Sequence, residues 1–206
     1  LTDHQKQKLE ECRVAGHDDL HLMAPAGAGK TFVALHRTLE ILSADDADVC
    51  ALFVARNVAL CYFMARWVCA RMRDPLKLRR LLRRLHVLHE PFDEGVRQIH
   101  INRHGRLVME RLSAAEYRLL VVDEAHHIYR DFEMRAAVER YLGANSQRLL
   151  VSDVSQSSSA DIVYPPNLHP VQLTEVVRCS KRIVTAATSF QLGGDEKLKT
   201  QCHHDS

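Results

Sequence analysis

The stretch Ala24–Thr31, APAGAGKT, has the residue types of a loop that binds phosphate. Glycines let backbone N–H groups approach an anion, Lys30 can reach the β- and γ-phosphates of a nucleotide, and the Thr31 hydroxyl can ligate Mg²⁺. Ala24 replaces the glycine of the strict pattern, so a glycine-rich turn before an ordinary helix is the alternative. We expect ATP to contact Ala26, Gly27, Ala28, Gly29, Lys30 and Thr31.

Two acids follow the apolar run Leu119–Val122. A phosphate loop needs a carboxylate on a neighbouring strand to hold Mg²⁺, which predicts Asp123 and Thr31 as the metal ligands. Glu124 is predicted to orient and deprotonate the attacking water, a task worth about 10²–10⁴-fold in rate. The acids could instead simply begin a helix, where negative charge is favoured. The phosphate loop upstream favours the catalytic interpretation.

Two histidines, His126 and His127, follow the acids and raise the question of zinc. Adjacent residues on a helix point roughly 100° apart, and no HExxH pattern or cysteine lies nearby. We therefore expect neither histidine to bind a metal. The same holds for the terminal group of Cys202, His203 and His204, which lies in a polar segment.

The elements that position these residues are visible in the apolar pattern. Residues 32–42, 60–68 and 134–142 repeat apolar side chains at helical spacing. Between them lie short apolar runs without polar alternation, typical of strands buried on both faces, at 20–23, 49–54, 119–122 and 149–151. This alternation predicts a three-layer α/β/α fold with a central, mostly parallel sheet. Gln98–Arg111 alternates around a central His-Gly pair and predicts an inserted β-hairpin, and a loop is expected after Val151.

Composition excludes several classes of protein. The 206 residues, 46% of them hydrophobic, are enough for one well-packed domain. No run approaches 18 apolar residues, so no membrane partner is expected. The net charge of +2 does not by itself indicate a nucleic-acid-binding protein. Six cysteines without a CxxC pair suggest reduced thiols and an intracellular protein, cytoplasmic or nuclear.

Four further stretches resemble motifs of superfamily 1 DNA and RNA helicases. LTDHQ at the N-terminus resembles the Q motif, LLVSDVSQS (149–157) resembles motif III, and LTEVVRCSKRIV (173–184) resembles motif IV. LFVARNVALCYFM (52–64) lies where motif Ia is found and is similar to the helicase-like part of Schlafen-type proteins. Together with the phosphate loop and the acids, they imply a RecA-like P-loop NTPase lobe that uses ATP and Mg²⁺.

The resemblance also implies roles for individual residues. Gln5 would read the adenine base, and Gln156 would sense the γ-phosphate. Arg178 would stabilise charge on the γ-phosphoryl group, a contribution that reaches about 10³–10⁵ in rate for arginine fingers; taken alone, it could equally be a surface arginine. The implied partner is single-stranded DNA or RNA, with Arg56 and Asn57 as the contacts.

The chain departs from this family in three respects. His126 completes the letters DEAH, more typical of superfamily 2, and Ser152 replaces a usual glycine. The family's ATPase closes between two RecA-like lobes, and nothing here resembles the later motifs V and VI. We therefore expect residues 1–190 to form one lobe of a longer protein. Residues 191–206 would be a polar tail or the start of a linker to a second lobe.

The segment Arg71–Arg84 carries seven basic residues with interleaved leucines. It could follow a phosphate backbone, or it could be the solvated face of a core helix. For the chain as a whole, an ATP-hydrolysing helicase lobe is the leading hypothesis. The alternatives are a regulatory module that binds nucleotide without turnover and a P-loop kinase acting on a small molecule.

Overall fold

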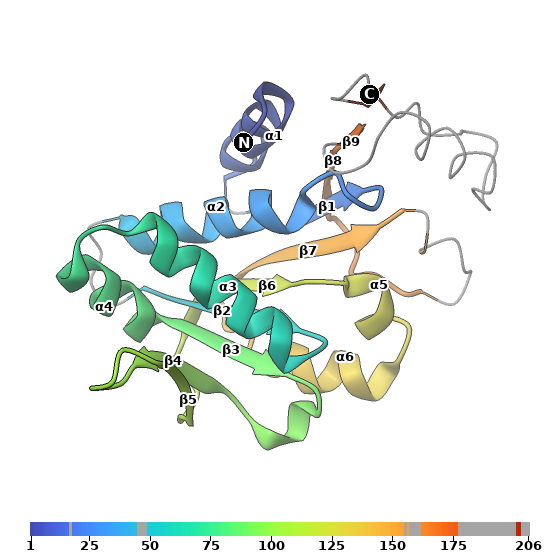
Figure 1. Ribbon diagram of the computed structural model, residues 1–206. Coiled ribbons are helices and arrows are strands. Elements are labelled where there is room, and N and C mark those ends of the chain that lie inside the picture. Colours follow the sequence, from blue (N-terminus) through green and yellow to red (C-terminus); the bar gives the residue numbers. More distant parts are fainter. Residues whose placement is uncertain (17, 45–48, 155, 157–161, 177–200, 203–206) are drawn as a thin grey trace. The chain divides into compact units, whose positions relative to one another are not determined.

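The computed structural model describes residues 1–16, 18–44, 49–154, 156, 162–176 and 201–202 (Figure 1). The chain divides into two compact units. The first contains residues 1–37, 124–131 and 149–206, and the second contains residues 38–123 and 132–148. Each unit brings together segments that lie far apart in the sequence.

The first unit is built on parallel strands around β1 (Leu20–Ala24). On one side β1 pairs with β7 (Gln147–Asp153), and on the other it pairs with β8 (His169–Gln172). All three run in the same direction, and the core positions of β1 and β7 are fully buried. The carboxyl ends of β1 and β7 therefore lie side by side, with Ala24 opposite Asp153.

Two helices and a short pair of strands complete the described part of the first unit. The helix α1 (Asp3–Val14) begins with a capping box, in which Thr2 and Gln5 satisfy each other's backbone N–H groups. The four-residue helix α5 (Ala125–Ile128) follows the acids. The strands β9 (Glu175–Val176) and β10 (Gln201–Cys202) pair in parallel. The helix α2 (Lys30–Ser43) begins in this unit and ends in the second.

The second unit contains a mixed sheet in the order β5-β4-β3-β2-β6. Parallel pairing joins β2 (Cys50–Ala55) to β3 (Leu85–His89) and β6 (Tyr117–Val122). The hairpin of β4 (Arg97–Ile101) and β5 (Leu107–Arg111) is antiparallel and adds to β3. The predicted hairpin is therefore confirmed, with its turn at Asn102–Arg106.

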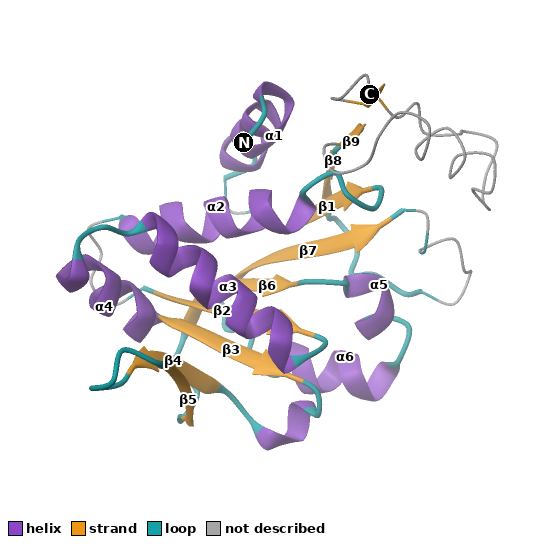
Figure 2. Cartoon of the chain, in the orientation of Figure 1, coloured by secondary structure: helices purple, strands orange, loops and turns teal. Residues whose placement is uncertain are grey.

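The second unit also contains helices, which Figure 2 shows in purple beside the orange strands. They are α3 (Val58–Arg71), α4 (Pro75–Arg84), the 3-10 turn η1 (Phe92–Glu94) and α6 (Phe132–Glu139). The basic segment is divided between two helices: Arg71 ends α3, and α4 begins at Pro75, where Asp74 caps it by accepting from the N–H groups of Leu76 and Lys77. Its leucines at positions 78, 81 and 82 are buried and its arginines at 79, 80 and 83 are exposed.

The sequence-based element pattern was wrong in three places. No strand was predicted directly after the basic segment, yet β3 begins at Leu85, because α4 passes into the strand without a loop. The third predicted helix ends at Glu139, and tight turns continue to Leu142. Beyond the loop predicted after Val151 lies β8, a short strand that was not predicted and that pairs with one side of β1.

The predicted α/β class with mostly parallel strands is confirmed. Cys12, Cys50, Cys61 and Cys69 are free thiols. Among the described residues, no helix is long and apolar enough to cross a membrane. The predicted boundary at residue 190 and Arg178 both lie outside the described residues.

Candidate nucleotide site

The phosphate loop follows β1 directly and leads into α2. Gly27 and Gly29 adopt φ values of 81° and 83°, in the left-handed region that favours glycine. The Gly29 carbonyl accepts from the N–H groups of Phe32 and Val33, at 3.0 and 3.2 Å, and so starts the helix. A strand, a glycine turn and a helix N-terminus in this order form the backbone of an anion site.

Gln5 braces this loop from α1. Its side-chain nitrogen donates to the Ala28 carbonyl at 2.9 Å, and its side-chain oxygen accepts from the Thr2 N–H at 3.0 Å. A Cβ atom added at Gly29 would lie 2.4 Å from that nitrogen, so the Gln5 amide would have to move away from the loop. The predicted role in reading adenine stays a prediction; one amide hydrogen of Gln5 is left for such a contact.

Lys30 is buried, with 8% of its surface exposed. Its ammonium lies 3.6 Å from Asp153 Oδ2 and 3.9 Å from Glu124 Oε1. Asp153 is itself 1% exposed at the end of β7. Sequence analysis missed this carboxylate as a site residue, although it lies within the stretch that resembles motif III. Its place opposite Ala24 follows only from the register of the parallel strands.

Glu124 adopts a strained backbone conformation. Its φ of 53° and ψ of 41° lie in the left-handed region, which residues with a Cβ atom rarely occupy. Residues held in such conformations are concentrated at functional sites. The turn directs the Glu124 carboxylate toward two groups, the Lys30 ammonium and the ring of His126, whose Nε2 lies 3.4 Å from Oε2.

His126 is fully buried and connects the acids to Gln156. Its Nδ1 accepts from the Asp153 N–H at 3.4 Å, and its Nε2 lies 3.4 Å from Gln156 Oε1. Burial lowers the pKa of His126 below its ordinary value, and His127 adds to the effect, while Glu124 opposes it. A neutral ring with its proton on Nε2 fits both contacts. Gln156 in turn donates to Asp153 Oδ2 at 3.5 Å.

The geometric reason for rejecting a metal at the histidines was wrong. The short α5 brings the rings of His126 and His127 to 4.2 Å between centroids. Ligand atoms of Glu124, His126 and His127 lie within 4.8 Å of one another. Both ring nitrogens of His126 already face protein groups, however, so a metal ion would have to displace one of those contacts.

A buried polar pair lies between β1 and β7. His21 Nε2 lies 2.6 Å from Ser152 Oγ, and the His21 ring packs against Tyr164 with 4.4 Å between centroids. Burial lowers the pKa of His21 to about 4. Ser152, the residue that departs from the helicase pattern, therefore contacts His21 through a hydroxyl that a glycine would lack.

The remaining predicted residues lie in several places. Thr31 is half-buried in the first turn of α2. Asp123 is 1% exposed in the second unit, where its N–H donates to the Val54 carbonyl at 3.0 Å. Asn57 caps α3 by accepting from the Leu60 N–H at 2.9 Å, and Arg56 Nε lies 3.8 Å from Glu90 Oε1. The magnesium and nucleic-acid roles of these residues rest on the sequence.

Comparison with known proteins was made at the level of families, sequences and solved structures. Residues 2–156 match the family described as DEAD/DEAH box helicase. The DEAH letters at positions 123–126, noted as a departure from superfamily 1, agree with this description. No curated protein sequence matches the chain.

Solved structures that are similar to the chain include the following two. One is the helicase domain of Hef from Pyrococcus furiosus, with a TM-score of 0.52 and 16% identity over 82% of this chain and 37% of that chain. The other is S. cerevisiae Dbp5 bound to Nup159, Gle1, IP6 and ADP, with a TM-score of 0.43 and 11% identity over 95% and 70%. The first likeness confirms the predicted fold. The present chain spans little more than a third of the Hef helicase domain's chain.

Proposed function

Because the chain belongs to the DEAD/DEAH box helicase family and folds as a RecA-like helicase lobe, we propose that it binds and hydrolyses ATP in response to single-stranded nucleic acid. It would do so as one lobe of a longer protein, with a second RecA-like lobe closing on the nucleotide. The observation that carries this proposal is Lys30, a buried cation between Asp153 and Glu124 at the end of a phosphate loop.

The residues around the loop fit a nucleotide's phosphates. A buried ammonium that lies 3.6 and 3.9 Å from its carboxylates makes no close hydrogen bond to them and can turn to phosphate oxygens when a nucleotide binds. The N–H groups at the start of α2 and the left-handed glycines favour an anion at the same place. Thr31 and Asp123 would hold Mg²⁺, which when bound neutralises charge on the β- and γ-phosphate oxygens.

Glu124 would be free to contact the attacking water once the Lys30 ammonium binds the phosphate. Its carboxylate, 32% exposed, is oriented by the left-handed turn and by His126. It would position the attacking water and take its proton. Gln156 would report the state of the phosphate through His126 and Asp153, the two groups its amide faces. Arg178 would complete the site by stabilising charge on the γ-phosphoryl group.

Turnover measurements on the chain and on the longer protein test this proposal. ATP hydrolysis would be followed with and without a single-stranded oligonucleotide for the wild type, Glu124→Gln and the control Glu116→Gln, whose acid is exposed directly before β6. Glu124→Gln should reduce stimulated turnover about 10²–10⁴-fold and leave ATP binding intact.

Other outcomes would favour the alternative functions. Tight ATP binding without hydrolysis, even with the second lobe and nucleic acid present, would indicate a regulatory module. Phosphate transfer to a small acceptor would indicate a kinase. Equal turnover by the wild type and Glu124→Gln would contradict the assignment of the base.

A further inference from the structure

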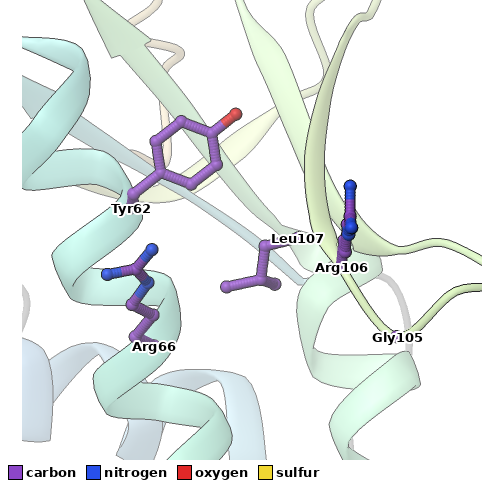
Figure 3. A pocket seen from close by; sticks show the side chains of 5 residues that line it. All are labelled: Tyr62, Arg66, Gly105, Arg106 and Leu107. Carbon is purple, nitrogen blue, oxygen red and sulfur yellow. The ribbon is translucent and has the colours of Figure 1, made fainter.

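A hollow of about 540 Å³ lies between α3 and the β4–β5 hairpin, within the second unit. It is lined by Tyr62, Arg66, Gly105, Arg106 and Leu107, which we call the hairpin hollow. Figure 3 shows Tyr62 and Arg66 on α3, facing Leu107 across the space, with Arg106 beside it on the hairpin. Its volume is within the range of small-ligand sites.

Local structure holds the walls of this hollow in place. Tyr62 and Arg66 are four residues apart on α3 and therefore share one face of the helix. On the opposite wall, the Asn102 side chain accepts from the N–H groups of His104 and Arg106, at 2.9 and 3.0 Å. Gly105 supplies the left-handed residue of the turn, with φ of 73°. The hairpin tip is thus organised before any ligand binds.

The arginines of the hollow are available to a ligand. Arg66 and Arg106 are exposed, and within the described part of the chain neither guanidinium has a hydrogen-bond or ion-pair partner. Other arginines of the same unit do have partners: Arg97 pairs with Glu94, and Arg148 pairs with Glu139. Two unpaired cations at the border of one concave space favour an anionic ligand.

A second hollow, of about 380 Å³, lies along the same hairpin where β4 meets α4. Its lining includes Arg79, Arg83 and Arg103, all exposed and likewise without an acidic partner among the described residues. The hairpin is therefore bordered by two arginine-lined hollows. An extended polyanion can use both of them, whereas a single phosphate can use only one.

The hairpin hollow also offers surfaces that an inorganic anion would not need. The ring of Tyr62 and the side chain of Leu107, both half-buried, provide an aromatic and an apolar wall beside the two guanidinium groups. Aromatic stacking combined with a basic groove is the usual means of binding single-stranded nucleic acid. Arginine can also stack on a base while it contacts a phosphate.

We propose that the hairpin hollow binds one nucleotide of a single-stranded nucleic acid, with its base against Tyr62 and Leu107 and its phosphates on Arg66 and Arg106. The second hollow would take neighbouring phosphates of the same strand. This site is distinct from Arg56 and Asn57, the contacts expected from sequence. The choice of a nucleic acid as the ligand rests on the proposed function.

Binding of fluorescein-labelled 12-nucleotide strands, one of uridine and one of thymidine, would be measured on the 206-residue chain by anisotropy, without ATP and over a salt series. The variants are Arg66→Glu, Arg106→Glu and Tyr62→Ala. The matched control is Arg80→Glu, an exposed arginine of α4 that lines neither hollow. Circular dichroism of each variant confirms that it folds.

Each variant has its own expected result. Loss of one phosphate contact should lower the slope of log K against log salt by about 0.7 for Arg66→Glu and Arg106→Glu. Tyr62→Ala should weaken binding about 5- to 100-fold, the range for one stacked base, with an unchanged slope. Arg80→Glu should change the affinity less than about twofold. In the wild type, a 4-thiouridine strand should crosslink to a peptide containing Tyr62 or Leu107.

Several results would overturn the proposal. These are equal losses for Arg66→Glu and Arg80→Glu, a crosslink confined to other peptides, or complete competition by an acidic peptide such as polyglutamate. Saturation of the hollow by uridine monophosphate at the same affinity as the strand would mean that its ligand is a free nucleotide and not a strand. Lys30→Ala should retain strand binding, so failure of ATP binding and failure of the hollow are distinguishable.

Discussion

The positively charged side chains at the phosphate loop of the first unit and at the hairpin of the second have opposite surroundings. Lys30 is 8% exposed and lies between two carboxylates, whereas Arg66 and Arg106 are exposed and have no acidic partner among the described residues. A buried cation must be compensated at all times, so a ligand at Lys30 replaces existing partners. An exposed arginine needs no such exchange, and binding at the hairpin should therefore depend more strongly on salt.

The largest expected effect is on the stability of the first unit and comes from its buried histidine, His21. Burial lowers the pKa of His21 to about 4, while in the unfolded chain it returns to about 6.5. The unfolded state therefore binds more protons between these values, and stability present above pH 6.5 is lost as the pH falls toward 4. The loss attributable to His21 should approach about 3 kcal/mol.

Urea unfolding at several pH values measures this loss. His21→Gln should show a flatter dependence of unfolding free energy on pH between 6.5 and 4. The control, His104→Gln, changes an exposed residue of the hairpin turn and should follow the wild type within about 0.5 kcal/mol. Parallel curves for His21→Gln and the wild type would show that His21 is not the titrating group.

A pair of glycine substitutions compares the two regions directly. Gly29 and Gly105 have similar φ values of 83° and 73°, so alanine strains either backbone by roughly 1–2 kcal/mol. At Gly29 the new Cβ would also lie 2.4 Å from Gln5 Nε2, whereas at Gly105 nothing lies within 4 Å. We expect about 2–3 kcal/mol of destabilisation for Gly29→Ala and about 1 kcal/mol for Gly105→Ala.

Chemical unfolding of both variants provides the measurement. The double variant Gln5→Ala/Gly29→Ala should recover the excess cost, because the side chain that the new Cβ meets is then absent. Equal destabilisation at the two glycines would mean that Gln5 does not brace the loop.

The smallest expected effect on stability distinguishes the buried cation, Lys30, from the exposed cation, Arg66. Lys30→Ala takes the ammonium away from the buried carboxylate of Asp153 and should cost about 1–3 kcal/mol of unfolding free energy. Arg66→Ala removes an exposed side chain and should stay within about 0.5 kcal/mol. Thermal unfolding of the two variants checks this, and Asp153→Asn combined with Lys30→Ala should recover part of the loss. Identical midpoints would remove the distinction between the regions.

Sequence alone predicted the features that depend on local pattern. The glycines and lysine of the phosphate loop, the strand before Asp123 and the hairpin at 98–111 each carry their signal within a few residues. In parallel strands, residues that follow a strand lie at its carboxyl end, so the phosphate loop and the two acids are each predicted at the carboxyl end of a strand. The carboxylate of Asp153 was missed because it belongs to the site only through the register of β7 with β1.

Other features depend on contacts between distant segments or on unusual backbone. Tyr62 and Leu107 are far apart in the sequence, and no local pattern indicates that the hairpin turns toward α3. The placement of His126 follows from the left-handed turn at Glu124, a residue type that gives no sign of such a conformation. For this reason an ideal-helix geometry separated two histidines whose rings in fact lie 4.2 Å apart.

The most direct test of the central claim is Mg²⁺-ATP binding to the 206-residue chain, measured by calorimetry for the wild type, Lys30→Ala and Lys77→Ala. Lys77 is an exposed lysine of α4 and controls for the loss of one charge. The wild type and Lys77→Ala should bind equally, and Lys30→Ala should bind about 10- to 100-fold more weakly, the range for one hydrogen bond to a charged group. Equal affinity of all three proteins would contradict a nucleotide site at Lys30.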